Sequence, residues 1–252
     1  MLGDKGEIMK KLTTLILALL LSVSAFSKEI VVSAAASLKN CLEEILPEYE
    51  KLSGDKVLLN LGGSGTLRTQ IENGVPVDLF ISADQKNVKI LVDKDMAKKE
   101  NSYDFLSNSL ILVKSPYSKS SVNSVEGLKN SDVYLVIGNP DTAPVGNYTL
   151  TALKNLEILD KLNREKLVYA KDVSAVVQYV EMGEADFGVI YNSDKNRMKN
   201  PIVVAEFPEN SHEKIIYSLA LLNNNKETES FFEFLRKDET KKIFKKHGFI
   251  VM

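Results

Sequence analysis

Hydrophobic patterns typical of strands and of helices alternate along this chain, and this alternation restricts its fold more than any other feature. Residues 29–33 (EIVVS) form an apolar, β-branched run that is typical of a buried strand. Apolar side chains then recur at three- and four-residue spacing from Leu38 to Leu52, and Gly54 is a suitable stop for the helix that this pattern predicts. Because strands and helices keep alternating, we expect an α/β fold with right-handed crossovers between parallel strands.

The expected elements fall into two units. The first has strands at 29–33, 57–61 and 77–82 and helices at 38–52, 66–73 and 83–92. The second begins after an apolar run at 109–114, with strands at 133–137, 167–170 and 187–191 and helices at 146–156 and 173–182. A long apolar strand at 215–222 can return the chain to the first unit, and helices at 227–236 and 239–246 follow. We therefore expect two α/β lobes, with residues 28–112 plus 221–252 in lobe 1 and residues 113–220 in lobe 2.

The first 27 residues have the pattern of a cleavable signal peptide. Lys10 and Lys11 precede an apolar run from residue 12 to residue 21, and small residues follow as far as Ser27. The apolar run is shorter than the roughly 20 residues that a spanning helix needs. We expect residues 1–27 to be removed on export, with either Met1 or Met9 as the start. No second apolar span and no lipid-attachment cysteine follows, so a periplasmic location fits best.

Composition argues against several classes of function. The formal net charge is −2 and no Lys/Arg cluster follows the N-terminus, which disfavours nucleic-acid binding. The single cysteine, Cys41, allows neither an intrachain disulfide nor a paired-cysteine metal site. His212 and His247 lack ligand spacing, and Thr66 stands where a nucleophile elbow around Ser64 would need glycine. We expect no enzyme activity, no cofactor and no directly coordinated metal.

Four strand-to-helix turns share one layout, in which small or polar residues open the helix. These turns are residues 34–37, 62–66, 142–146 and 172–173. The first N–H groups of a helix have no partner inside it and carry partial positive charge, so a helix start can bind an anion without a charged side chain. The turns predict an anion site where several helix starts converge. The alternative is that Ser37, Ser64 and Asp172 only cap their helices.

Several longer stretches carry a family resemblance. They are AAASLKN (34–40), GSGTLRTQIENGVPVDLFISADQKNV (63–88), NSLILV (108–113), GNPDTAPVGNY (138–148), KDVSAVVQYVEMGEADFGVIYNSD (171–194) and FFEFLR (231–236). In these stretches the chain resembles the periplasmic molybdate-binding proteins, the substrate-binding components of ABC importers. The resemblance implies a type II periplasmic-binding fold, with an anion enclosed between two α/β lobes. It also implies a transporter permease as partner, and we expect the mature protein to be a monomer.

The resemblance also implies a set of ligand-binding residues. Hydroxyl donors are expected from Ser37 and Ser64, which lie in the first two turns. Backbone amide donors are expected at Val145 and Val173, and a further hydroxyl at Tyr191. Molybdate or tungstate would be held as an oxyanion through these residues. Sulfate and a small organic anion remain as alternatives, because the sequence does not report the size of the cavity.

Two positions depart from the family pattern without removing a matched donor. Val145 stands where the family usually has alanine, and Gly63 replaces a frequent serine. A cage of donors without a carboxylate would leave the proton of hydrogen phosphate unpaired, which predicts that phosphate is rejected. Asp78 and Asp84 are expected to cap or brace loops, and Arg68 and Lys39 to lie on solvated faces.

Overall fold

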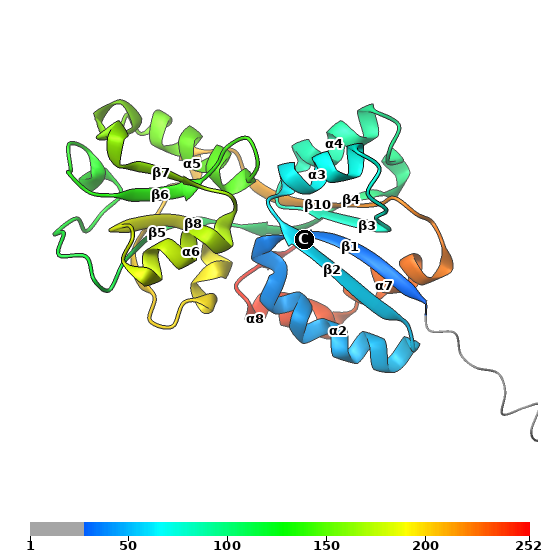
Figure 1. The fold of residues 1–252 in the computed structure, drawn as a ribbon. Coiled ribbons are helices and arrows are strands. Elements are labelled where there is room, and N and C mark those ends of the chain that lie inside the picture. The colour runs from blue at the N-terminus through cyan, green and yellow to red at the C-terminus, as the bar shows by residue number, and fades with distance from the viewer. Residues whose placement is uncertain (1–27) are drawn as a thin grey trace, which may run out of the picture.

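Two mixed sheets, each flanked by helices, form two lobes that lie side by side (Figure 1). The computed structural model describes residues 28–252, so the expected signal peptide at residues 1–27 lies outside the described residues. The two-lobed α/β architecture agrees with the expectation from the sequence. In the described part of the chain, no helix is long and apolar enough to cross a membrane.

Lobe 1 is built on a six-stranded sheet with the order β11-β4-β10-β3-β1-β2. Its strands are β1 (Glu29–Ala35), β2 (Lys56–Gly62), β3 (Leu79–Ser82), β4 (Ser102–Asn108), β10 (Ile215–Leu221) and β11 (Ile250–Val251). β1 runs parallel to β2 and β3, whereas β10 is antiparallel to both β3 and β4. The carboxyl ends of β1, β2 and β3 therefore meet at one edge of the sheet.

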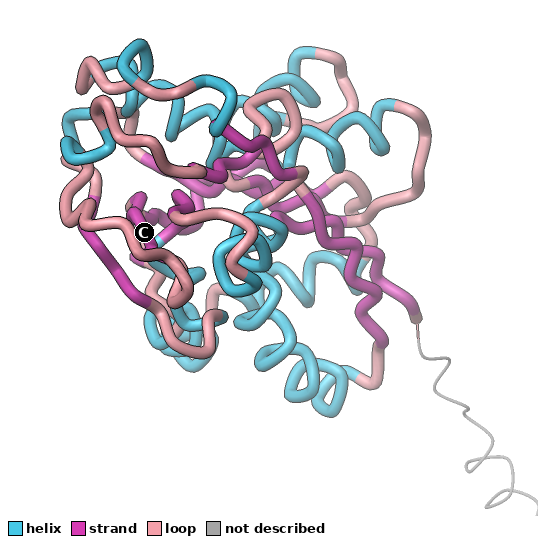
Figure 2. The backbone as a smooth tube through the Cα atoms, turned by 60° about the vertical axis from the view of Figure 1, so that its left-hand side comes forward, coloured by secondary structure: helices cyan, strands magenta, loops and turns pink. Residues whose placement is uncertain are grey.

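Helices cover both faces of this sheet. They are the short 3-10 helix η1 (Ala36–Leu38), α2 (Lys39–Ser53), α3 (Ser64–Glu72), α4 (Gln85–Asp93), α7 (Lys226–Leu235) and α8 (Asp238–Lys246). α3 and α4 lie on one side of the strands, and α2, α7 and α8 lie on the other (Figure 1). The turned view in Figure 2 also shows helices on both sides of the strands. Coverage on both faces explains why β3 is wholly buried and reads as a continuous apolar run.

Lobe 2 has a five-stranded sheet with the order β7-β6-β8-β5-β9. Its elements are β5 (Leu110–Lys114), β6 (Leu135–Gly138), α5 (Pro144–Asn155), β7 (Leu167–Ala170), α6 (Val173–Met182), β8 (Phe187–Tyr191), the 3-10 helix η6 (Asn192–Arg197) and β9 (Ile202–Glu206). α6 has the bounds that the sequence predicts, because both of its ends are encoded locally. The Asp172 side chain accepts from the Ala175 N–H at the start, and left-handed Gly183 (φ 75°) closes the end.

The chain passes between the sheets at two points. It leaves the first sheet at Ser109, between β4 and β5, and returns across residues 207–214, between β9 and β10. The expected lobe boundaries, after residues 112 and 220, instead cut β5 and β10. Both strands are apolar along their length, and an apolar run alone does not show which sheet a strand joins.

Three observed strands were absent from the sequence prediction. β4 (SYDFLSN) is polar in part, and Asp104 within it accepts a hydrogen bond from Ser218 of β10 at 2.7 Å. β9 is an edge strand whose Ile202 and Val203 are exposed, and β11 has only two residues. Such strands owe their conformation to a neighbouring strand more than to their own periodicity.

Candidate anion site

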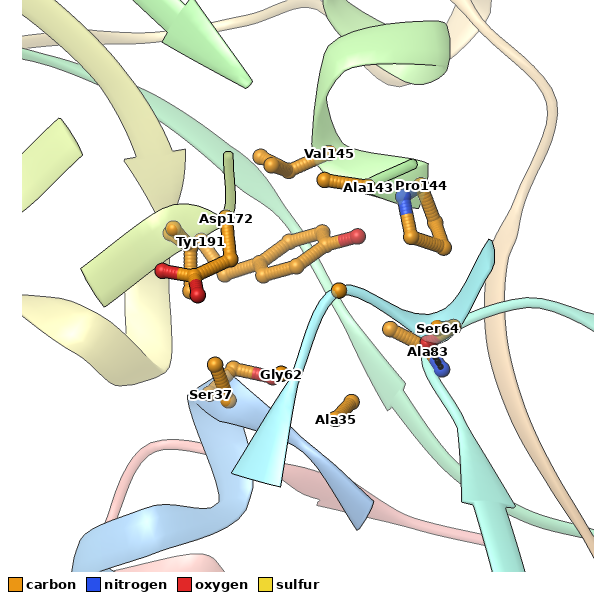
Figure 3. Close-up of a pocket in the computed structure, with 13 residues that line it drawn as sticks. Ala35, Ser37, Gly62, Ser64, Ala83, Ala143, Pro144, Val145, Asp172 and Tyr191 are labelled. Atoms are coloured by element: carbon orange, nitrogen blue, oxygen red, sulfur yellow. Dashed lines mark hydrogen bonds between the residues drawn. The ribbon is translucent and has the colours of Figure 1, made fainter. Parts of the chain in front are cut away.

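A small pocket lies where the two lobes meet, and all five predicted site residues line it. Ser37 and Ser64 belong to lobe 1, at the turns after β1 and β2. Val145 and Val173 lie at the starts of α5 and α6, and Tyr191 ends β8, all in lobe 2. Figure 3 shows residues of both lobes facing the same space. Tertiary structure thus brings together residues that span more than half of the sequence.

The pocket is very small. Its cavity volume is about 10 Å³, whereas two neighbouring surface grooves measure about 290 and 420 Å³. A volume of this size is close to the roughly 10–15 Å³ that a single water molecule requires on the same scale. The lobes therefore approach closely around this pocket, which argues against a ligand as large as an amino acid or a sugar.

Three helix starts supply backbone donors to the pocket. α3 begins at Ser64, α5 at Pro144 and α6 at Val173, and the first N–H groups of each have no partner inside the helix. Pro144 has no N–H of its own, so the first amide of α5 that can donate is that of Val145. The positive ends of these helix dipoles meet at the pocket.

A hydrogen-bond chain in lobe 1 holds the Ser37 hydroxyl in place. The Asn108 side-chain oxygen accepts from the Ser109 N–H at 3.0 Å, so its Nδ2 donates to the Tyr217 hydroxyl at 3.4 Å. The Tyr217 hydroxyl lies 2.8 Å from Ser37 Oγ, and either of the two hydroxyls can be the donor. When Tyr217 donates, the Ser37 hydroxyl accepts from the protein and has its own hydrogen available to the pocket.

The Ser64 hydroxyl accepts a hydrogen bond through its oxygen and has its hydrogen available. Its Oγ accepts a hydrogen bond from the Ala83 N–H at 3.0 Å, and the side chain is fully buried. The hydroxyl hydrogen of Ser64 is therefore free to point at a ligand. Ala83, which follows β3, also lines the pocket. This supporting role of the turn after β3 was not predicted from the sequence, where an alanine gives no chemical signal.

Tyr191 has a buried hydroxyl that no described residue satisfies. The residue is 1% exposed, and its Oη has no hydrogen-bond partner within residues 28–252. Burial raises the pKa of Tyr191 well above its ordinary value, with smaller contributions from Tyr217 and Tyr148, so this hydroxyl keeps its hydrogen and is available as a donor. An unpaired buried hydroxyl is costly, and a ligand that accepts from it would remove that cost.

The position of Asp172 contradicts the expectation that no carboxylate borders the site. Its carboxylate is among the groups that line the pocket, and the residue is 8% exposed. The Asp172 side chain accepts from the Ala175 N–H at 3.0 Å, so it caps α6 as expected while also bordering the site. The pocket is therefore not free of carboxylates. The amides at the start of α6 offset this negative charge, because the cap holds the carboxylate against the positive end of the helix dipole.

Among the described residues, no lysine, arginine or histidine lines the pocket, so its lining has no positively charged side chain. Arg68 lies outside the pocket and donates to Asn87 at 2.9 Å. Within residues 28–252, no group of three His, Cys, Asp or Glu side chains is placed to hold a metal ion. Any anion here would be held by neutral donors.

Two glycines explain how the lobes approach so closely. A Cβ atom at Gly63 would lie 2.4 Å from the Thr142 carbonyl oxygen, and one at Gly65 would lie 2.7 Å from the Asp141 carbonyl oxygen. The Gly65 N–H donates across the lobes to the Thr142 carbonyl oxygen at 2.9 Å. The departure at Gly63 thus has a steric role, since serine there would push against the backbone of lobe 2.

The fold and the pocket together define a two-lobed solute-binding protein. The chain belongs to the bacterial extracellular solute-binding protein family, whose sequence model matches residues 30–250. This is a family of binding proteins rather than enzymes, in agreement with the expectation from the sequence.

Individual relatives narrow the comparison. The chain is 34% identical to the molybdate-binding protein ModA of Haemophilus influenzae over 96% of this chain and 99% of that one. It is 36% identical to ModA of Escherichia coli over 88% and 89% of the two chains. The solved periplasmic molybdate-binding protein of Azotobacter vinelandii superposes with a TM-score of 0.77 at 25% identity, covering 88% of this chain and 99% of that one. The predicted family and the predicted type II binding-protein fold are confirmed.

Proposed function

We propose that this protein captures molybdate, and also tungstate, between its lobes and delivers the anion to the permease of an ABC importer. One observation carries the proposal. The hydroxyl hydrogens of Ser64 and Tyr191 have no described acceptor, the Ser37 hydroxyl can accept from Tyr217 and keep its hydrogen, and Ser37, Ser64 and Tyr191 border the same small pocket. An oxyanion that offers only acceptors is complementary to such a group of donors.

The energetics favour a dianion in this pocket. A buried ion is very costly to desolvate unless it is fully hydrogen-bonded. Each charge-assisted bond contributes about 1.5–3 kcal/mol, so three hydroxyls together with the amides of Val145 and Val173 can offset that cost. Buried helix starts add about 0.3–1 kcal/mol each, and more in favourable geometries. Relatives that are named as molybdate-binding proteins support the choice of ligand.

Phosphate and sulfate are also tetrahedral anions, and each differs from molybdate in one property that affects binding in this pocket. Hydrogen phosphate carries a proton that needs an acceptor, and the carboxylate nearest to the pocket is that of Asp172, whose Oδ1 accepts from the Ala175 N–H. We expect phosphate to bind more weakly than molybdate, and phosphate binding as tight as that of molybdate would mean that the second oxygen of Asp172 accepts this proton. Sulfate presents acceptors only and is smaller than molybdate, so only a poorer fit to the size of the cavity can weaken its binding, and sulfate is the main alternative ligand.

Export and partners follow from the same proposal. The pattern of residues 1–27 supports a cleaved signal peptide and a periplasmic mature protein. A monomer presents both lobes to one permease, which would recognise the closed, loaded arrangement. Apart from the anion, no cofactor is proposed.

Calorimetric titration of residues 28–252 with molybdate, tungstate, sulfate and phosphate tests the proposal. We expect one site per chain, similar affinities for molybdate and tungstate, and weaker binding of sulfate and of phosphate. If sulfate binds more tightly than molybdate, the protein is a sulfate carrier. If none of the four anions binds, the site does not hold tetrahedral oxyanions.

A further inference from the structure

Arg197 is a largely buried arginine that does not line the pocket but bonds to residues that lie beside it. Arg197 ends η6, and its side chain is 12% exposed. Its Nη1 donates to the Ala36 carbonyl oxygen at 3.1 Å and to Asp194 Oδ1 at 2.7 Å. Its Nη2 donates to Ser174 Oγ at 2.7 Å. One guanidinium group therefore makes three hydrogen bonds.

The partners of Arg197 are next to the proposed ligand donors on both lobes. Ala36 immediately precedes Ser37 in η1 of lobe 1. Ser174 immediately follows Val173 in the first turn of α6, which belongs to lobe 2. The bond to Ala36 crosses between the lobes, whereas the bond to Ser174 stays within lobe 2. Arg197 therefore connects the turn that carries one donor to the helix start that carries another.

Asp194 holds the guanidinium in this orientation. The residue is fully buried, and its second carboxylate oxygen has no hydrogen-bond partner within residues 28–252. Burial raises the pKa of Asp194 to about 6, against the opposing effect of Arg197. A buried ion pair is weak support for stability, because desolvation offsets much of the attraction. This pair is better explained by its geometry, which aims Arg197 at the opposite lobe.

A second bond between the lobes lies at another side of the pocket. The Gly65 N–H donates to the Thr142 carbonyl oxygen at 2.9 Å, and Gly65 directly follows Ser64. The turn that carries each pocket serine is therefore tied to lobe 2 by one hydrogen bond to a backbone carbonyl oxygen. Opening of the lobes would break both bonds, while the bonds from Arg197 to Asp194 and Ser174 would persist within lobe 2.

We infer that Arg197 is a positioning residue that latches the closed, loaded state by holding the Ser37 turn against the start of α6. The inference deepens the proposed function and rests on it. Arg197 does not touch the anion. Its bond to Ala36 exists only when the lobes are closed, so it slows release without changing capture. Most differences in affinity among variants of one site arise in the dissociation rate.

Stopped-flow kinetics with molybdate test the latch. The chain has no tryptophan and nine tyrosines, and Tyr191 borders the pocket, so tyrosine fluorescence can report binding. We expect Arg197→Met to raise the dissociation rate about 10- to 100-fold, as for loss of a charge-assisted bond. The association rate should stay within about threefold, because the open state is unchanged. Arg197→Lys should release nearly as fast, since an ammonium cannot reproduce the planar fork.

Two further variants sharpen the test. Ser174→Ala keeps the bond to Ala36 but removes one support of the guanidinium, and should raise the dissociation rate about three- to tenfold. Arg164→Met is the matched control in lobe 2, because Arg164 pairs with Asp160 on the surface, 54% of its side chain is exposed, and it contacts nothing in the pocket. Its binding kinetics should equal those of the wild type.

The outcomes separate the latch from the proposed function. If the wild type does not bind molybdate, the proposed function fails. If the wild type binds and Arg197→Lys and Ser174→Ala both release at the wild-type rate, the latch is refuted. A slower association that high salt abolishes would also refute it, because Arg197 would then act by attracting the anion. Should Arg197→Met fail to fold, Arg197→Lys and Ser174→Ala decide the question.

Discussion

The two lobes line one pocket with different kinds of polar group. Lobe 1 has the hydroxyls of Ser37 and Ser64, and each is hydrogen-bonded to a buried group of the same lobe. Lobe 2 has helix-start amides and the Tyr191 hydroxyl, which has no partner in the described structure. In the proposed site, lobe 1 therefore holds its donors through protein contacts, whereas Tyr191 would gain its first hydrogen bond from the ligand. Mutation of a lobe 1 hydroxyl should therefore weaken both the unliganded fold and binding, whereas mutation of the Tyr191 hydroxyl should weaken binding alone.

The largest effect is expected at the contact between the lobes. Gly65→Ala would place a Cβ 2.7 Å from the Asp141 carbonyl oxygen, which obstructs closure but not the folding of either lobe. Overpacking of this kind costs about 1–3 kcal/mol, so calorimetry should show molybdate affinity falling about 10- to 100-fold or more. Small-angle scattering should show less compaction on adding molybdate.

Gly127→Ala is the matched control for this glycine. Its Cβ would meet only lobe 2 atoms, at 3.3 Å or beyond, far along the chain from the pocket residues. Its molybdate affinity and ligand-induced compaction should match those of the wild type. Normal compaction in Gly65→Ala would show that the lobes do not need this close approach.

Ser64→Ala should weaken both binding and the unliganded fold. The variant loses one donor to the anion, which costs about 1.5–3 kcal/mol of binding free energy. It also leaves the buried Ala83 N–H without its acceptor, which lowers the free energy of unfolding of the unliganded protein by about 1–3 kcal/mol. Titration with molybdate and urea unfolding without ligand measure the two effects. An unchanged affinity would remove Ser64 from the site.

Tyr191→Phe should separate the two effects. Removal of the hydroxyl costs a donor to the anion, so molybdate affinity should fall about 10-fold or more. The unliganded protein should be as stable as the wild type or more stable, because the lost hydroxyl had no partner in the described structure. Urea unfolding without ligand is the decisive measurement. Clear destabilisation would mean that the hydroxyl is already satisfied in the unliganded protein.

The smallest effect concerns the pH dependence of stability. The pKa of Asp194 is raised by burial to about 6, so between about pH 4 and pH 6 the folded state holds a proton that the unfolded state has released. The contribution of Asp194 to the free energy of unfolding should therefore fall as pH rises through this window and stay level above it. Asp194→Asn removes this contribution. The difference between the two pH profiles isolates Asp194 from other carboxylates, and a constant difference from pH 4 to pH 7 would contradict the raised pKa.

Local sequence signals predicted much of the fold. α6 was predicted with its observed bounds because Asp172 and Gly183 mark its ends in the sequence itself. β7 and β8 were also predicted with their observed bounds, since both are short, apolar and β-branched or aromatic. β4, β9 and β11 were missed because their conformation depends on the strand beside them. The lobe boundaries shifted for a similar reason, since β5 and β10 do not encode which sheet they join.

The site, like the fold, was predicted from the sequence only in part. The five predicted residues line one pocket, although their role as ligands remains a prediction. The carboxylate of Asp172 at the pocket wall, the support from Tyr217 and Ala83 and the bridge from Arg197 to Ala36 had no local signal. Ala83 supports the site through its backbone N–H, which every residue except proline has, and Arg197 acts on a carbonyl oxygen 161 residues away.

The sequence by itself indicated the turns at which α3, α5 and α6 begin, with their small residues and free amides, and the Asp172 cap of α6, because those depend on residues within one turn of each other. Only the tertiary structure decided which hydroxyl hydrogens remain available, how closely the lobes approach and which side chains hold them there. Those properties depend on contacts between segments far apart in the chain, and on distances of a few tenths of an ångström that no local pattern encodes.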